Sequence, residues 1–329
     1  MIQPNSTSGL DPVTFEVLKN AFVTAVDQMA EQVLRTCYSF VIYVRDFSNG
    51  LFYAEGNTVA EGTADIAAHV GTLHYTCKAS IEQFAGDMHP GDVYITNDPY
   101  LGGTHFSDVR LIRPIFVGDE LIGFSQSCGH WADVGGSVPG SFDCTAKTYY
   151  EEGLRITPMR MWSKGVFNKD IARMICANTR LEGDSMGDMH ALAAATKVGE
   201  QEIVRLVGKY GKETILQAFS EVQDYVERFT RTRIAALPDG TWECEDYVDF
   251  DPNGSGDGLV PVRVKMTIDG DEVHYDLSGS HPAIGSLSNS AFGGSFSGIV
   301  SGMKIFFPEV PLNSGFYRPI GFAGPSFRA

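Results

Sequence analysis

The N-terminal part of the chain has the apolar periodicity of an α-helix. Asp11 followed by Pro12 is a typical N-cap and first-turn pair. Apolar residues then recur at spacings of three and four, the repeat of one helix face, at Phe15, Leu18, Phe22, Val26, Met29 and Val33. The pattern predicts a long amphipathic helix that begins near Asp11.

Shorter apolar runs follow this helix and predict strands with a second helix between them. Ser39–Val44 is apolar and β-branched and is expected to be a strand. Gly50–Gly62 is expected to form a hairpin that turns at Glu55-Gly56-Asn57. The apolar spacing over Ala68–Phe84 predicts a helix.

Two loops rich in polar residues and glycine lie at the ends of the next strands. "NDPYLGGTHFSDV" (Asn97 to Val109) follows a buried strand expected over Gly91–Asp98. "GHWADVGG" (Gly129 to Gly136) follows a hairpin expected over Val109–Ser127, which turns at Gly118-Asp119. The hairpin brings its two ends together, so the two loops are expected to lie close to each other.

The second half of the chain changes from helical to β periodicity. Asn168–Ala236 is expected to be mostly helical and to end at Pro238-Asp239-Gly240. The following segments predict strands around a turn at Asp269-Gly270, with a flexible connection over Asp251–Gly258. Gly285–Ser301 is rich in glycine and serine, and such a stretch usually packs closely against another segment or lines a site.

These patterns predict a mixed α/β fold of the α+β class with three regions. Residues 1–165 are expected to form a β-hairpin-rich N-terminal region that carries the substrate and metal-site loops. Residues 166–237 are expected to form a helical middle, and residues 238–329 a β-rich C-terminal region.

Composition and charge narrow the class of protein. The 329 residues are 43% apolar, which is enough for a sizeable core, and the formal net charge of −16 disfavours nucleic acid and anionic membranes as partners. The six cysteines form no C-x-x-C pair and are expected to be reduced thiols. The start of the chain lacks the charge and apolar pattern of a signal peptide, and no apolar run approaches the ~20 residues of a membrane span. A cytoplasmic location is therefore expected.

The residue types in the two loops are those of a metal site. His105 and Asp108 are three residues apart, and His130 would complete a set of two imidazoles and one carboxylate, which suits Zn, Mn or Fe. An isolated H-x-x-D pair is more often a polar turn, but the strand ends and neighbouring glycines favour a site here. Asp98 and Asp133 would either orient an imidazole through its other nitrogen or cap a turn.

The motifs together resemble the hydantoinase B/oxoprolinase family, whose members include subunits of N-methylhydantoinases, 5-oxoprolinases, caprolactamase, and the acetone and acetophenone carboxylases. The motifs that carry the resemblance are "DPVTFEV", "NDPYLGGTHFSD", "ADVGG", "EEGLRI", "NTRLEGDSMGD" and "IAALPDGTWECEDYVD". The resemblance implies that His105, Asp108 and His130 are metal ligands. It also raises a substrate-side or acid–base role for His69, against the usual core histidine of an apolar run, and leaves Asp133 as a second candidate catalytic residue.

The resemblance further implies a division of labour between subunits. ATP, with Mg, would be used by a hydantoinase A-type partner of actin-like fold, and this chain has no P-loop sequence. The metal would polarise the carbonyl group of a small substrate, so that water opens a hydantoin, oxoproline or lactam ring. The alternatives are a ketone carboxylase, which has a small third subunit, and a non-catalytic assembly subunit.

Two features depart from the family pattern. Many members have a second histidine where this chain has Trp131, which would change substrate polarity or a proton relay. Members also continue past the segment Asn313–Ile320, so the β-rich region is expected to be incomplete, whether as a short form, a fragment or a chain completed by another polypeptide. The segment Tyr149–Glu152, with Arg155, would be a substrate or partner loop or simply a solvated face.

Overall fold

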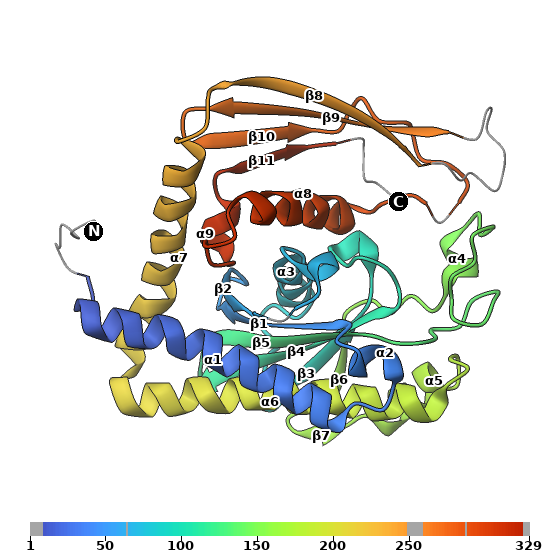
Figure 1. Ribbon diagram of the computed structural model, residues 1–329. Helices are drawn as coiled ribbons and strands as arrows, with labels where there is room; N and C mark the ends of the chain where they lie inside the picture. Colours follow the sequence, from blue (N-terminus) through green and yellow to red (C-terminus); the bar gives the residue numbers. More distant parts are fainter. Residues whose placement is uncertain (1–8, 64, 249–258, 287, 325–329) are drawn as a thin grey trace.

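The computed structural model describes residues 9–63, 65–248, 259–286 and 288–324 and has the predicted α+β class. Its larger sheet has the order β2-β1-β5-β4-β3-β6-β7, and every pairing in it is antiparallel (Figure 1). The strands are β1 (Phe47–Tyr53), β2 (Thr58–Glu61), β3 (Val93–Thr96), β4 (Asp108–Val117), β5 (Glu120–His130), β6 (Met159–Ser163) and β7 (Val166–Phe167). The predicted turns at residues 55–57 and 118–119 are confirmed.

Long helices cover one face of this sheet. The predicted first helix is confirmed as α1 (Pro12–Thr36), whose N-cap Asp11 accepts hydrogen bonds from two backbone N–H groups. The predicted helical middle contains α5 (Lys169–Cys176), α6 (Glu182–Tyr210) and α7 (Lys212–Ile234). Figure 1 shows α1 and α6 lying across the sheet, where their apolar faces and the sheet bury the largest hydrophobic core.

The other face of the sheet is covered by shorter elements. These are the 3₁₀ turn η1 (Ala67–His69), α3 (Leu73–Gln83) and, above them, α8 (Phe292–Phe306) (Figure 1). The single helix predicted over residues 68–84 is wrong in its first turn, because the chain breaks at Gly71 with φ of +73°. The glycine- and serine-rich stretch does pack closely, since most of it forms α8 against η1.

A second, four-stranded sheet has the order β11-β10-β9-β8. Its strands are β8 (Gly240–Val248), β9 (Val260–Asp269), β10 (Glu272–Asp276) and β11 (Ile320–Ala323), and β10 and β11 pair parallel. The turn at residues 269–270 is confirmed, whereas the flexible connection predicted at 251–258 lies outside the described residues. The short helix α9 (Ser314–Tyr317) precedes β11 and packs against α7.

The strand predicted over Ser39–Val44 is wrong, because the segment forms the short helix α2 (Phe40–Tyr43). The Ser39 side chain caps this helix, and the Asp188 carboxylate accepts hydrogen bonds from the backbone N–H groups of Tyr38 and Ser39. This contact from α6 is distant in sequence, so the local apolar pattern could not reveal it. Among the described helices, none combines the length and the apolar character that crossing a bilayer requires.

Candidate metal centre

The register of the β4–β5 hairpin brings the two predicted loops together. Asp108 at the start of β4 lies directly opposite His130 at the end of β5. This register includes a β-bulge between Ile115 and Phe116. A shift by one residue would place Gly129 opposite Asp108 and turn the imidazole to the other face of the sheet.

Asp108 is the centre of a cluster of imidazoles. The Nδ1 atom of His105 lies 3.0 Å from Oδ2 of Asp108, and Nδ1 of His130 lies 3.3 Å from Oδ1. The Nε2 atom of His69 lies 3.0 Å from the same Oδ1, and the Thr104 hydroxyl donates a hydrogen bond to Oδ2. The three residues predicted to be metal ligands are therefore brought together, and one ligand atom from each lies within 4.8 Å of the others.

The donor atoms of this cluster fit a divalent cation. Among the described residues, Nδ1 of His105 and Oδ1 of Asp108 are buried without a hydrogen-bond partner, although charged or polar atoms lie close by. Unpaired buried donor and acceptor atoms are costly, and a metal ion would satisfy them. The Asp108 carboxylate is fully buried, while 41% of the His105 side chain is exposed, so the cluster opens toward solvent on the His105 side.

The Asp108 carboxylate and the surrounding imidazoles stabilise one another's charged forms. Burial opposes ionisation of Asp108, but the close imidazoles of His69, His105 and His130 outweigh it and hold the pKa of Asp108 well below its usual range. Burial likewise opposes protonation of His69, but the neighbouring Asp108 carboxylate raises the pKa of His69 well above its usual value. The same balance raises the pKa of His105. The site therefore carries an ionised carboxylate among imidazoles.

His69 lies behind Asp108. Its side chain is only 1% exposed, and its Nδ1 atom lies 3.1 Å from the hydroxyl oxygen of Ser48 on β1. Buried Cys128 joins His69 and Asp108 in a second group of ligand atoms within 4.8 Å of one another. Sequence reasoning did not select Cys128, although its position two residues before His130 on one strand places both side chains on the same face.

Asp46 is a further acid that the sequence pattern did not select. One of its carboxylate oxygens lies 3.8 Å from Nδ1 of His130, and its backbone carbonyl accepts a hydrogen bond from the His130 N–H. It lies just before β1, which pairs with β5. An isolated acid in a connecting segment gives no local signal, so only the strand order places it beside the cluster.

Comparison with known proteins agrees with the motifs. Residues 11–326 match the hydantoinase B/oxoprolinase family. The chain belongs to this family. Caprolactamase subunit beta of Pseudomonas jessenii is 32% identical over 320 residues, which cover 96% of this chain and 54% of that subunit.

Solved structures share the family fold. The crystal structure of the ATP-dependent caprolactamase from Pseudomonas jessenii matches with a TM-score of 0.89 and 31% identity, over 97% of this chain and 55% of that chain. A nucleotide-free acetone carboxylase matches with a TM-score of 0.87 over 96% of this chain and 44% of that chain, and its 21% identity shows the fold alone. This chain spans about half the length of these relatives.

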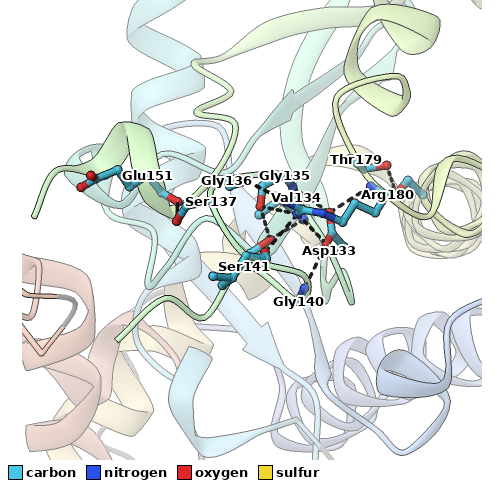
Figure 2. Close-up of polar contacts among 12 residues, drawn as sticks. Asp133, Val134, Gly135, Gly136, Ser137, Gly140, Ser141, Glu151, Thr179 and Arg180 are labelled. Carbon is cyan, nitrogen blue, oxygen red and sulfur yellow. Dashed lines mark hydrogen bonds and ion pairs between the residues drawn. The ribbon is translucent and has the colours of Figure 1, made fainter. Parts of the chain in front are cut away.

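Two of the motifs that indicated the family meet around Asp133. Figure 2 shows its carboxylate accepting hydrogen bonds from the backbone N–H groups of Gly135, Gly140 and Arg180, at 2.8, 3.0 and 3.0 Å. The Arg180 guanidinium lies 3.1 Å from the same carboxylate and also donates to the carbonyl groups of Gly135, Gly136 and Val138. Both oxygens of Asp133 are thus engaged by the loop and by Arg180 rather than by an imidazole.

The rest of the "ADVGG" loop packs against α4 (Tyr149–Glu152). Gly136 has a φ of +81°, and a Cβ atom there would lie 2.5 Å from the Glu151 carbonyl oxygen, so the loop needs glycine at this position. Asp98, the other acid considered for orienting an imidazole, pairs with Arg155 at 2.7 Å and caps a 3₁₀ turn. The loop is thereby held against α4, and Asp98 is engaged by Arg155 rather than by an imidazole.

Trp131, where many family members have histidine, does not face the cluster. Its side chain is buried in the main hydrophobic core, whereas the neighbouring His130 points to the opposite side of the chain, toward Asp108. The departure at this position therefore places a large apolar side chain in the core where many family members have an imidazole.

A buried carboxyl group lies between the cluster and the C-terminal segment. Glu61 on β2 accepts a hydrogen bond of 2.8 Å from the Tyr317 hydroxyl on α9. Burial raises the pKa of Glu61 to about 7, although the Tyr317 hydrogen bond works in the opposite direction. The folded protein therefore binds this proton more tightly than the unfolded chain does.

We expect Glu61 to make the protein less stable as pH rises. The contribution is favourable below the ordinary pKa of 4.5 and is lost as pH rises through about 7. Between these two pH values the free energy of unfolding of the unmodified protein should fall by up to about 3 kcal/mol, because one pKa unit corresponds to about 1.4 kcal/mol. Glu61→Gln should remove this fall. Urea unfolding across this pH range measures the effect, with Glu55→Gln at the exposed turn of the same hairpin as the control. Parallel curves for Glu61→Gln and the unmodified protein would contradict the assignment.

Proposed function

We propose that this chain holds a divalent metal, Zn, Mn or Fe, and binds the carbonyl group of a cyclic amide that an ATP-dependent complex opens by hydrolysis. The convergence of His105, Asp108 and His130 on one partly open point carries this proposal. The 32% identity to caprolactamase subunit beta favours a lactam-type amide over a ketone. The likeness to acetone carboxylase is one of fold and does not favour carboxylation.

Each residue of the cluster has a distinct part in the proposal. A bound metal would supply polarisation of the substrate carbonyl and a water molecule of lowered pKa. His105, Asp108 and His130 would hold it, because two imidazoles and a carboxylate suit these ions. His69 contacts Asp108 from behind and is itself fixed by Ser48, so we assign it a positioning role.

The ATP-using part of the reaction is assigned to another polypeptide. The chain has no P-loop sequence, and the caprolactamase it resembles is named as ATP-dependent and as having a beta subunit. We therefore assign ATP and Mg to a hydantoinase A-type partner subunit. A small third subunit belongs to the carboxylase alternative and is not required for ring opening.

Reconstitution tests the proposal. The chain is produced together with a co-encoded ATP-using subunit, and metal content, ATP hydrolysis and opening of hydantoin, oxoproline and lactam rings are measured. We expect ATP-dependent ring opening that is lost with the metal on chelation and restored by Zn, Mn or Fe. Consumption of a ketone with bicarbonate would indicate carboxylation instead. A metal-free chain that still assembles fully with its partner would indicate a non-catalytic subunit.

A further inference from the structure

A groove of about 320 Å³ adjoins the exposed side of the cluster. It lies between η1, the segment Thr104–His105 and one face of α8. The α8 residues that line it are spaced by three and four, as one helix face requires: Gly294, Ser297, Gly298 and Ser301. A larger groove of about 470 Å³ is lined by residues of α1 and α6 and by none of the cluster residues. Figure 1 shows these two helices on the opposite face of the seven-stranded sheet from α8.

The α8 wall is fixed to the segments that carry the cluster. The hydroxyl groups of Ser297 and Ser301 both donate to the backbone carbonyl of Ala67 in η1, at 2.9 and 3.1 Å. At the start of α8, a Cβ atom on Gly293 would lie 2.4 Å from the Gly103 carbonyl oxygen, two residues before His105. The distance across the groove is thus set by direct contacts on both sides.

The chemistry of the wall suits a small, uncharged ring that carries an N–H group. His105 is the one ionisable side chain among the described residues that line the groove. The hydroxyl hydrogens of Ser297 and Ser301 are used by Ala67, so their oxygens offer lone pairs to a ligand. An amide N–H can donate to such an oxygen, whereas a simple ketone has no hydrogen to donate.

The width of the groove depends on a missing side chain. Gly298 is exposed, lines the groove, and has no atom within 4 Å of the place where a Cβ would stand. A methyl group at this position would therefore project into the groove without disturbing the helix. Gly302, four residues further along α8, also has free space around its Cβ position but does not line the groove.

We propose that this groove holds the ring of a cyclic amide substrate and that Gly298 sets the largest ring it accepts. The proposal rests on the proposed function for the identity of the ligand. It assigns the carbonyl end of the substrate to the His105 side and the carbon skeleton to the wall formed by α8. Gly298 is in this sense a specificity-determining residue, whereas His105 belongs to the metal centre.

The proposal predicts that the affinity for a lactam depends on the size of its ring. Binding of unsubstituted five-, six- and seven-membered lactams to the full chain is measured by ligand-detected NMR for the unmodified protein, Gly298→Ala and Gly302→Ala. Gly298→Ala should weaken binding of the seven-membered ring by about tenfold, the effect of roughly one methyl group in a pocket, and affect the five-membered ring least. Gly302→Ala gives the same increase in helix propensity and should bind all three rings as the unmodified protein does.

The outcomes separate this proposal from the proposed function. Equal behaviour of Gly298→Ala and Gly302→Ala, equal weakening for every ring, or no lactam binding by the unmodified chain would overturn the ring site. If the reconstituted complex opens lactams and Gly298→Ala leaves its ring-size preference unchanged, the ring site fails while the reaction stands. If the rings bind with the expected dependence but are not opened, the reaction fails while the ring site stands.

Discussion

Asp108→Asn is expected to lower the metal affinity of the chain at least about 100-fold, because even residues that only orient a ligand change affinity by roughly 10–100-fold. The amide keeps the shape of the side chain but removes the negative charge that faces His69, His105 and His130. Calorimetric titration with Zn²⁺ and Mn²⁺ and metal analysis after dialysis measure the loss. Asp119→Asn, at the exposed turn of the same hairpin, should keep full metal content.

Two further variants decide which group of donors holds the metal. His105 belongs only to the partly open group, and Cys128 belongs only to the fully buried group that shares Asp108. We expect His105→Ala to lose the metal and Cys128→Ala to retain it. The reverse result would assign the metal to His69, Asp108 and Cys128, and full metal content in both Asp108→Asn and His105→Ala would show that the cluster is only a polar core.

Asp133→Asn is expected to destabilise the fold by about 3 kcal/mol, because it removes the charge of a buried carboxylate that accepts several hydrogen bonds and leaves their donors unpaired. The new amide group would direct N–H donors toward the donors of Gly135, Gly140 and Arg180. Chemical unfolding at neutral pH measures the change. Asp143→Asn alters a partly exposed acid of the same loop, which forms no ion pair among the described residues, and should cost under about 1 kcal/mol.

The destabilisation caused by Asp133→Asn is expected to depend on pH. Burial opposes ionisation of Asp133, but the hydrogen bonds from Arg180, Gly135 and Gly140 outweigh it and lower its pKa below the usual 3.8. Its contribution to stability is therefore complete above that value and is lost as pH falls through the lower pKa of the folded state. The difference between Asp133→Asn and the unmodified protein should shrink in acid. A difference that stays constant with pH, or metal loss from a fully stable Asp133→Asn protein, would contradict the loop-holding role.

Local sequence patterns predicted part of the candidate metal centre. The polar residue types, the glycines and the strand ends were sufficient to predict that His105, Asp108 and His130 would converge. A two-residue turn at positions 118–119 fixes a hairpin, but its register at the far end depends on the bulge between Ile115 and Phe116. Neither residue type marks such a shift, so the local sequence does not reveal which residues pair at the far end of the hairpin.

The sequence by itself determined the elements whose causes are local. Asp11 and Pro12 start the first helix, alternating apolar residues make the hairpins, and the motifs place the chain in its family. Only the tertiary structure decided that Phe40–Tyr43 is a helix, that Asp133 binds Arg180, and that α8 forms a wall beside His105. Each of these depends on contacts between segments far apart in the chain. Their free energy exceeds the small local preferences, and no local pattern records them.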